Sequence, residues 1–579
     1  MTALGRAIPC RRILNAVVPF RKGDGRHYTA LVVGPERHSG VWLRRARVCA
    51  LFVGLTAVMT WPSVLHLATH SVEHHDIFFN LWRMEWVRHA LLTSPASLFD
   101  GNQFYPERGV LAYSDAMLVE SIIALPLLSA GLPPMLVHNL LLLGVFAASG
   151  VGMFVLARHL WSSTPAAIVA GLIFAFAPYR FSHFMHMELQ WAVWMPWAFW
   201  ALQRTLATRS LRYGLLTGVF MSLQLLSSIY YGLFLAIILA AVGALQMIAM
   251  GRRAVRAIAV LAAGAAILAI TAWVYSTPYR QASARVGVRT TEEMRRYSAV
   301  PSSYFRVPET NRVLGRWRSG STELSLYPGI VPVALGLIAL VAMRPTWITL
   351  AYALGLALAA DFSFGLNGFL YPHLQYHVAI FKGLRAPSRA SILFLLCLAV
   401  LAARATAAVL ARVPRGKQAL CAVAIAAVIL IEYWSAPMRL VSYPRSALLY
   451  ELLAQLPDGN VLELPVPQPD GLPFHDASYL YTSTFHWKTL VNGYSGYYPP
   501  SYLRRLRRLA TLPSPAALDQ IRADNVRWVV VHEQRYRDPA EAGHVIDALI
   551  RLGALPLGRM HDGWNLATLI DVRPVTEAR

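Results

Sequence analysis

Long apolar blocks separated by polar loops make up most of the chain as far as residue 435. The blocks are mostly about 17–25 residues long, enough for a helix to cross the hydrocarbon core of a membrane. The pattern predicts a polytopic α-helical membrane protein with about 11 spans. We expect spans at residues 49–66, 135–157, 165–179, 190–206, 212–230, 231–250, 255–275, 328–343, 346–362, 390–411 and 418–435.

One further apolar segment, residues 117–131, is short and contains Glu120 and Pro126. We expect a re-entrant or interfacial helix there rather than a span. Charge supports this choice, because with a cytoplasmic N-terminus three short basic loops then lie inside, where Arg and Lys are enriched. These loops carry Arg204, Arg209 and Arg212; Arg252, Arg253 and Arg256; and Arg412, Arg415 and Lys417.

The same topology places loops 67–116, 180–189, 276–327 and 363–389 outside the cytoplasm. Loop 276–327 is itself basic, but the charge rule is weak for long loops. The last part, residues 436–579, also lies outside. Its helical patterns alternate with strand-like runs such as "NVLELPV" and "RWVVVHE", so we expect an extracytoplasmic α/β domain with a mostly parallel sheet.

Composition agrees with a membrane protein, since 56% of residues are hydrophobic and only 14% are charged. The net charge of +23 is scattered along the chain, which argues against a nucleic-acid partner and for contact with membrane lipid. Residues 1–48 carry ten Arg and Lys against two acids, as suits a cytoplasmic N-terminal segment. The four cysteines imply no disulfide framework.

The segment directly after the first span, "HSVEHHD" at residues 70–76, combines two carboxylates with three imidazoles. Glu73 and Asp76 should lie near the outer membrane surface. A second polar cluster, "APYRFSHFMHMELQW", holds His183, His186 and Glu188 and falls on the same predicted face. Two such clusters could supply a general base and ligands for a divalent cation such as Mg²⁺ or Mn²⁺.

Other interpretations of these residues stay open. His74 and His75 suit a solvated loop, and Glu73 suits an exposed position. His183 and His186 could cap a helix. Asp76 is the stronger of the two acids, because "DIFFNLWRMEWVRHALL" after it predicts an amphipathic interfacial helix, with Trp82 and Trp86 as headgroup anchors. No HExxH, CxxC or P-loop pattern occurs in the sequence, so no metal motif supports the cation.

Two later stretches could bind other parts of a substrate. "FKGLRAPSRA" places Lys382, Arg385 and Arg389 at the outer entrance of a span, and the spacing of its two arginines predicts one helical face. Arginine binds phosphate bidentately, although snorkelling to lipid headgroups is an equal alternative. "VNGYSGYYPP" offers Tyr494, Tyr497 and Tyr498 as sugar-stacking rings or as interfacial side chains.

These features resemble the GT-C superfamily of integral-membrane glycosyltransferases. The resemblance comprises the acid after the first span, the Trp-bearing helix, "FYP" in a long first outer loop, the polar cluster after the third span and the soluble C-terminal domain. The superfamily includes protein O-mannosyltransferases, the aminoarabinose transferase of lipid A and oligosaccharyltransferases. The runs "ELSLYPG", "LRAPSRA" and "VNGYSGYYPP" also look like those of bacterial membrane proteins placed loosely beside it.

The resemblance implies a transmembrane domain at 49–435 and an inverting enzyme that uses a polyprenyl-phosphate-linked sugar. Asp76 would be the catalytic carboxylate, with Glu73 as a helper. Glu188, or His183 and His186, would occupy the place of the second acid. Arg385, Arg389 and Lys382 would hold the phosphate. Many members carry adjacent acids or Asp-x-Asp where this chain has Glu-His-His-Asp, so metal use stays open.

We therefore expect a multi-pass glycosyltransferase of the bacterial inner membrane that acts on its extracytoplasmic face. Its acceptor would be a glycan, a lipid or a protein. The alternative is a non-enzymatic transporter or assembly factor for lipid-linked saccharides. Inverted repeats and broken helices would favour the transporter, whereas polar clusters gathered at one membrane face favour the enzyme.

Overall fold

The computed structural model describes residues 38–444, 447–467 and 474–573. The predicted basic segment at residues 1–48 therefore lies largely outside the described residues. The chain divides into two compact units, Met1–Arg47 and Val48–Arg579. Every residue of the candidate site belongs to the second unit.

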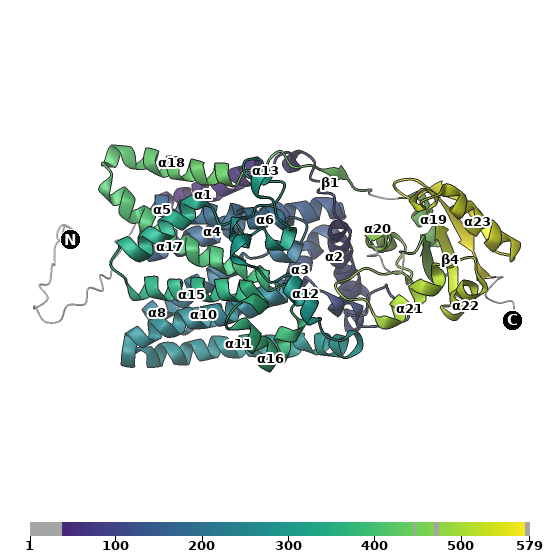
Figure 1. Cartoon of the computed structure of the whole chain (residues 1–579), viewed down its shortest axis with the longest axis horizontal. Coiled ribbons are helices and arrows are strands. Elements are labelled where there is room, and N and C mark those ends of the chain that lie inside the picture. Colours follow the sequence, from purple (N-terminus) through teal and green to yellow (C-terminus); the bar gives the residue numbers. More distant parts are fainter. Residues whose placement is uncertain (1–37, 445–446, 468–473, 574–579) are drawn as a thin grey trace, which may run out of the picture. The chain divides into compact units, whose positions relative to one another are not determined.

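Helices make up most of the chain from residue 38 to residue 432 (Figure 1). They are α1 (His38–Met59), α2 (His75–Thr93), α3 (Leu118–Ser129), α4 (Pro134–Trp161), α5 (Thr164–Phe176), α6 (Pro178–Ser182), α7 (Met187–Gln190), α8 (Trp194–Thr208), α9 (Leu211–Ser227), α10 (Ile229–Met250), α11 (Ala254–Val286), α12 (Thr291–Arg296), α13 (Gly315–Arg318), α14 (Ile330–Leu337), α15 (Trp347–Phe364), α16 (Tyr371–His377), α17 (Ser391–Arg412) and α18 (Arg415–Glu432).

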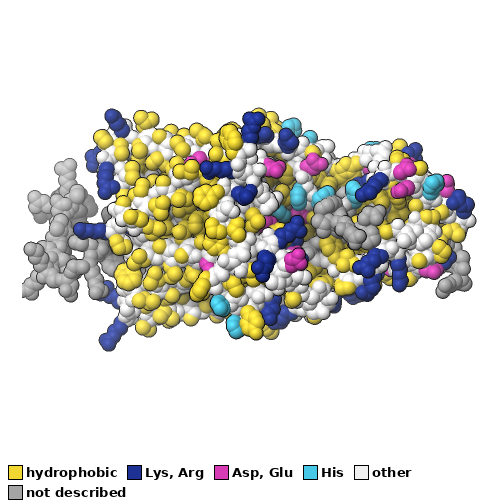
Figure 2. Space-filling view, in the orientation of Figure 1, with side chains coloured by type: hydrophobic (Ala, Val, Ile, Leu, Met, Phe, Trp, Pro, Cys, Tyr) yellow, Lys and Arg dark blue, Asp and Glu magenta, His cyan; other side chains and the backbone are white. Residues whose placement is uncertain are grey.

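Five stretches among the described residues are helical, long and apolar enough to cross a membrane. These are Pro134–Trp161, Thr164–Ser182, Ile229–Val286, Trp347–Asn367 and Pro387–Arg412. Figure 2 shows hydrophobic side chains over much of the visible face of the helical part, with Lys and Arg gathered mainly near its ends. The helical membrane architecture is thus supported, while the number of about 11 spans stays a prediction.

The segment expected to be re-entrant or interfacial forms α3, which has 12 residues. A helix of that length extends about 18 Å, well short of the roughly 30 Å of a hydrocarbon core. The α3 helix is therefore shorter than a full crossing requires. The re-entrant or interfacial placement of residues 117–131 stays a prediction.

Helices α9 and α11 approach closely at glycine positions. A Cβ atom added to Gly218 would lie 2.1 Å from the carbonyl oxygen of Gly264, and one added to Gly264 would lie 2.1 Å from that of Gly214. Small residues that let two helix backbones meet are typical of packing inside membranes. These two helices consequently form one of the closest contacts of the bundle.

The C-terminal part contains a four-stranded sheet and five helices. The strands are β3 (Asn460–Leu464), β4 (Val526–Val531), β5 (Leu555–His561) and β6 (Leu566–Asp571), in the order β3-β4-β6-β5. The helices are α19 (Leu448–Gln455), α20 (Phe474–Thr482), α21 (Pro500–Leu509), α22 (Pro515–Ala523) and α23 (Pro539–Arg551). The predicted α/β character is present, but a domain boundary at residue 436 stays a prediction.

The expectation of a mostly parallel sheet is wrong. Only β3 and β4 pair in parallel, whereas β4–β6 and β5–β6 are antiparallel. The physical reason is the short connection between His561 and Leu566. So few residues allow a hairpin but cannot provide the long crossover that parallel neighbours need.

A second, small pairing ties the start of the first loop to the chain that leads into the C-terminal part. Strand β1 (His70–Ser71) pairs antiparallel with β2 (Val441–Ser442). The Tyr443 hydroxyl next to β2 donates to the Val72 carbonyl at 2.8 Å. The polar heptad that begins at His70 is thereby anchored at both the strand and the following turn.

Helix α2 follows the predicted boundaries, but its environment differs from the prediction. Trp82 is 0% exposed and Trp86 is 9% exposed, so neither ring is a headgroup anchor. Their indole N–H groups donate to Asn102 Oδ1 and to the Leu98 carbonyl, at 2.9 and 2.8 Å. One face of α2 packs into the helical bundle beside α3, and the other packs on the first loop and the C-terminal part. Its amphipathic pattern did not reveal this second, tertiary contact.

Candidate functional site

Asp76 occupies the first turn of α2, at the end of the polar heptad. The helix begins after His74, whose Nδ1 accepts the Asp76 backbone N–H at 3.1 Å. A carboxylate in a first turn is stabilised by the positive end of the helix dipole. The local sequence thus sets the position of this side chain at the start of α2.

Two groups from distant segments contact the Asp76 carboxylate. The Tyr494 hydroxyl donates to Oδ1 at 2.8 Å, and His186 Nε2 lies 2.9 Å from Oδ2. Burial alone would raise the pKa of Asp76, but the hydrogen bond and positive charge of His186 outweigh burial and hold that pKa well below its ordinary value. The side chain keeps 18% of its surface exposed, so an ionised oxygen is available to a further donor.

The contacts continue from His186 into the protein. His183 Nδ1 lies 3.1 Å from His186 Nδ1, and His183 Nε2 lies 3.8 Å from Glu323 Oε2. Glu323 in turn accepts two hydrogen bonds from the Arg389 guanidinium, at 2.5 and 3.2 Å. We call the chain Tyr494–Asp76–His186–His183–Glu323–Arg389 the Asp76 network.

The two histidines of the Asp76 network must share one proton between their facing Nδ1 atoms. If His186 donates that proton, His183 can turn its Nε2–H toward Glu323, and each ring nitrogen then faces a complementary group. Burial lowers the pKa of His183 to about 3, which agrees with a neutral His183.

Glu323 is the network residue that the sequence predictions missed. Burial would raise its pKa, but the charge and the hydrogen bonds of Arg389 hold that pKa well below its ordinary value. Glu323 is the first residue of the "ELSLYPG" run that contributed to the resemblance. The available signal was weak, because Glu323 is one of four acids in this otherwise basic loop.

The structure brings together five of the predicted site residues in this network. They are Asp76, His183, His186, Arg389 and Tyr494. They come from the first loop, the loop after α5, the entrance of α17 and the C-terminal part. Their roles in catalysis and binding remain predictions.

Glu188 belongs to a different buried cluster. Its Oε2 lies 3.0 Å from Arg83 Nη2, and the same guanidinium donates to the Asp115 carbonyl at 2.7 Å. Burial raises the pKa of the Asp115 carboxyl to about 6, with the Glu188 charge acting in the same direction. Glu188 therefore contributes to holding α2 in place, and its contacts do not include Asp76.

Glu73, by contrast, is exposed. Among the described residues no ion pair is found for its carboxylate. Its position in the turn between β1 and α2 places it two residues before His75, where α2 begins. It has the surroundings of a surface acid, and the helper role stays a prediction.

The basic residues before α17 differ in their burial and in their ion-pair contacts. Arg389 is buried and held by Glu323, whereas Arg385 is half-buried, with its Nε 3.9 Å from Glu293 Oε1. Lys382 is exposed. The predicted common helical face is wrong, because Arg385 precedes the short 3₁₀ helix Pro387–Ala390, and Pro387 disfavours helix at the residue before it.

The three predicted tyrosines also differ. Tyr494 contacts Asp76, as described above. The Arg289 guanidinium lies 3.5 Å from the centroid of the Tyr497 ring, and the Tyr498 ring stacks at 6.3 Å on Tyr502. All three rings are partly exposed. The structure thus places Tyr494 at the candidate base, and sugar contact stays a prediction for the set.

A divalent cation does not fit the residues that surround Asp76. Within the described ranges, no group of three or more His, Cys, Asp or Glu side chains could hold a metal ion. Asp76 and His186 already contact each other as an ion pair. His183 is engaged with His186 and Glu323, so these side chains are directed at one another. No step proposed below passes through a metal.

No protein-family model matches the chain, and no curated protein matches it in sequence. In structure it is similar to the arabinofuranosyltransferase AftD from Mycobacteria, with a TM-score of 0.60 and 15% identity over 92% of this chain and 40% of that chain. It is also similar to an oligosaccharyltransferase from Archaeoglobus fulgidus (TM-score 0.48, 14% identity, 85% of this chain and 69% of that chain) and to ArnT from Cupriavidus metallidurans (0.47, 12%, 93% and 99%).

The match with AftD carries the structural comparison. This chain spans about 40% of the length of that protein, and at such low identity the likeness shows the fold alone. The likeness to AftD confirms the predicted resemblance at the level of fold. The chain shares its fold with part of the arabinofuranosyltransferase AftD.

Proposed function

We propose that this protein is a membrane glycosyltransferase that moves a sugar from a polyprenyl-phosphate donor to an acceptor hydroxyl on the extracytoplasmic face of the inner membrane. The observation that carries this proposal is the position of the Asp76 carboxylate. It is ionised, partly exposed and held by His186 and Tyr494 from two distant segments. A preorganised carboxylate of this kind suits general-base chemistry.

In the proposed reaction the acceptor oxygen forms a bond to the anomeric carbon while the bond from that carbon to the phosphate oxygen breaks. The hydroxyl proton passes to Asp76, and the electron pair of the broken bond leaves with the polyprenyl phosphate. Asp76 can accept this proton because a carboxylate has about four lone-pair positions, of which Tyr494 and His186 use two.

The leaving phosphate needs positive charge nearby. Arg385 and Lys382 are the candidates, since both keep exposed surface. Arg389 is less suited to direct phosphate contact, because Glu323 already engages its guanidinium through two hydrogen bonds. Arg389 instead holds Glu323, and through it the two histidines that orient Asp76.

The test uses the full chain in lipid nanodiscs with synthetic polyprenyl-phosphate arabinofuranose, followed by polyprenyl-phosphate mannose and glucose. The first donor is chosen because the structural neighbour AftD is named an arabinofuranosyltransferase. We expect release of polyprenyl phosphate from at least one donor, and loss of that release in Asp76→Asn. Release at the same rate by both proteins would contradict the proposed role of Asp76, and flipping of intact donor without cleavage would identify a transporter.

A further inference from the structure

A cavity of about 230 Å³ lies beside the start of α2, apart from the Asp76 network. Its walls come from two regions that are far apart in the chain. Helix α2 provides His75 and Phe78, and the C-terminal part provides the rest. Those are His475, Ser478, Arg535, Trp564 and Asn565.

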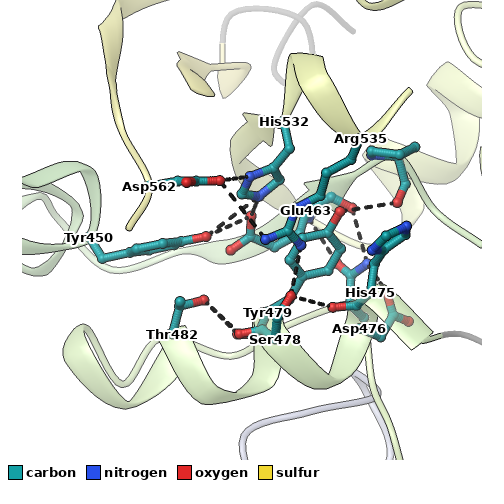
Figure 3. Close-up of polar contacts among 12 residues, drawn as sticks. Tyr450, Glu463, His475, Asp476, Ser478, Tyr479, Thr482, His532, Arg535 and Asp562 are labelled. Carbon is teal, nitrogen blue, oxygen red and sulfur yellow. Dashed lines mark hydrogen bonds and ion pairs between the residues drawn. The ribbon is translucent and has the colours of Figure 1, made fainter. Parts of the chain in front are cut away.

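Among the described residues that line this cavity, Arg535 is the one formal cation. Its guanidinium is firmly oriented. Its Nη1 donates to Ser478 Oγ at 2.7 Å, and the group lies 4.8 Å from the Tyr479 ring centroid and 5.3 Å from that of Trp564. Asp562 Oδ2 lies 4.0 Å behind it. Figure 3 shows the arginine pointing between α20 and the Asp562 turn.

A buried charge cluster supports that arginine. His532 lies between Glu463 and Asp562, with ring nitrogens 2.7 and 2.5 Å from their carboxylate oxygens (Figure 3). All three side chains are at most 1% exposed. Burying such groups is costly and seldom stabilises a fold by itself. Here the cluster fixes the Asp562 turn, and with it Trp564 and the position of Arg535.

The other polar groups of the cavity add a donor and acceptors. The Asn565 amide can donate and accept, whereas the Ser478 hydroxyl already donates to the His475 carbonyl at 2.7 Å and can only accept a further hydrogen bond. Burial, followed by the charge of Arg535, lowers the pKa of His475 to about 4, so that imidazole is neutral at pH 7. Neutral groups of this type match the hydroxyls of a sugar, while Phe78 and Trp564 offer apolar rings to its C–H faces.

The volume indicates a small ligand. It is below the roughly 300–1,000 Å³ typical of sites for drug-sized molecules and suits one sugar ring. We propose that this cavity binds one saccharide unit of the acceptor, at a distance from the hydroxyl that reacts. This inference rests on the proposed function, which it deepens by assigning a carbohydrate acceptor.

The position of the cavity on α2 explains how such binding would assist transfer. His75 and Phe78 are three residues apart and share one face of the helix, whereas Asp76 lies on the same turn and points toward Tyr494 and His186. One helical turn therefore carries both the candidate base and a wall of the cavity. An acceptor held in the cavity could present its next sugar to Asp76.

The experiment measures carbohydrate binding without turnover. Full-length Asp76→Asn protein in detergent is mixed with methyl α-arabinofuranoside, methyl α-mannopyranoside or methyl β-galactopyranoside, and contact is detected by saturation-transfer NMR. We expect at least one glycoside to bind, and Trp564→Leu or Arg535→Gln in the same background to weaken it about tenfold or more. Asn565→Ala provides a milder third variant if either of these fails to fold.

Matched controls alter the same residue types elsewhere. Trp317 is 76% exposed and Arg507 is exposed on α21, so Trp317→Leu and Arg507→Gln should bind the glycoside as the parent does. The proposal is overturned if no glycoside binds, or if the cavity variants that fold bind it as tightly as the controls. Glycoside binding, combined with a parent protein that cleaves none of the donors, would contradict the proposed function and leave the saccharide cavity supported.

Discussion

The hydroxyl of Tyr494 donates a hydrogen bond to the carboxylate of Asp76 at 2.8 Å, although the two residues are 418 positions apart in the chain. The contact joins the C-terminal part directly to the candidate base. His186 approaches the other carboxylate oxygen at 2.9 Å. The reactivity of Asp76 should therefore depend on the C-terminal part as well as on the helical part.

Substitutions of Asp76 and Glu73 should distinguish the roles of the two acids in the polar heptad. Asp76→Asn removes the proton acceptor and should lower transfer by about 10²–10⁴-fold, the usual range for a general base. Glu73→Gln is the matched control, because Glu73 is exposed, and it should retain nearly full activity. The measurement is release of polyprenyl phosphate by protein of equal melting temperature; a larger loss in Glu73→Gln than in Asp76→Asn would reverse the assignment.

Tyr494→Phe tests the contact between Asp76 and the C-terminal part. Loss of one hydrogen bond to a charged group should lower kcat roughly tenfold or more. The Tyr494 hydrogen bond also lowers the pKa of Asp76. The acidic limb of the rate profile should consequently move to higher pH in the variant. Tyr497→Phe is the control, since its hydroxyl donates to the Gly383 carbonyl instead; equal profiles for all three proteins would exclude a positioning role for Tyr494.

The sequence predicted the elements around the site better than it predicted their contacts. The apolar periodicity of "DIFFNLWRMEWVRHALL" located α2, and an acid at its start identified Asp76. The same pattern placed Trp82 at the membrane interface, whereas Trp82 is buried against Asn102. Local periodicity records that a helix has an apolar face, but it does not record which distant segment covers the other face.

The contacts of Glu323 and Tyr494 were missed for a similar reason. Glu323 and Tyr494 reach the site from loops far along the chain, and a single sequence gives no information on such pairings. Charge gave a partial indication, since the basic loop 276–327 needed an explanation and one of its few acids now supplies an ion pair. Glu188 was placed with Asp76 because both were expected at one membrane face, a constraint too coarse to exclude its actual partner, Arg83.

Removing the carboxylate partner of Arg389 and removing Arg385 should have different effects. Glu323→Gln leaves the buried Arg389 without its carboxylate and should destabilise the protein by about 3–5 kcal/mol, as breaking one half of a buried ion pair does. Arg385→Gln changes a half-buried side chain and should raise the donor KM with little change in melting temperature. Thermal melting and donor titration distinguish the two. A stable Glu323→Gln protein with normal kcat would show that the Asp76 network does not depend on this ion pair.

Gly493→Ala should disturb the contact between the "VNGY" segment and the first loop. A Cβ atom there would lie 2.4 Å from the Phe104 ring, and Phe104 is completely buried. Overpacking of this kind costs about 1–3 kcal/mol, and it should also weaken transfer because Tyr494 is the next residue. Gly543→Ala is the control, since nothing lies within 4 Å of its added Cβ. A melting temperature equal to that of the control would show that Phe104 can move aside.

Asp476 should give the C-terminal part a characteristic dependence on pH. Burial raises the pKa of Asp476 to about 7 from an ordinary 3.8, despite hydrogen bonds from Tyr502 and Asn492. Between about pH 4 and pH 7 the folded protein therefore retains a proton that the unfolded chain releases. Its contribution to stability is fully present below pH 4 and is lost as the pH rises through 7.

Asp476→Asn isolates that contribution, because an amide resembles the protonated acid and does not titrate. The melting temperature of the parent protein should fall between about pH 4 and pH 7 by an amount that the variant does not show. Asp519→Asn is the matched control, since Asp519 is 62% exposed and pairs with Arg522 at the surface, and it should follow the parent. An Asp476→Asn curve parallel to that of the parent would mean that the carboxyl is already ionised in the folded state. In that case the hydrogen bonds from Tyr502 and Asn492, rather than burial, would determine its charge.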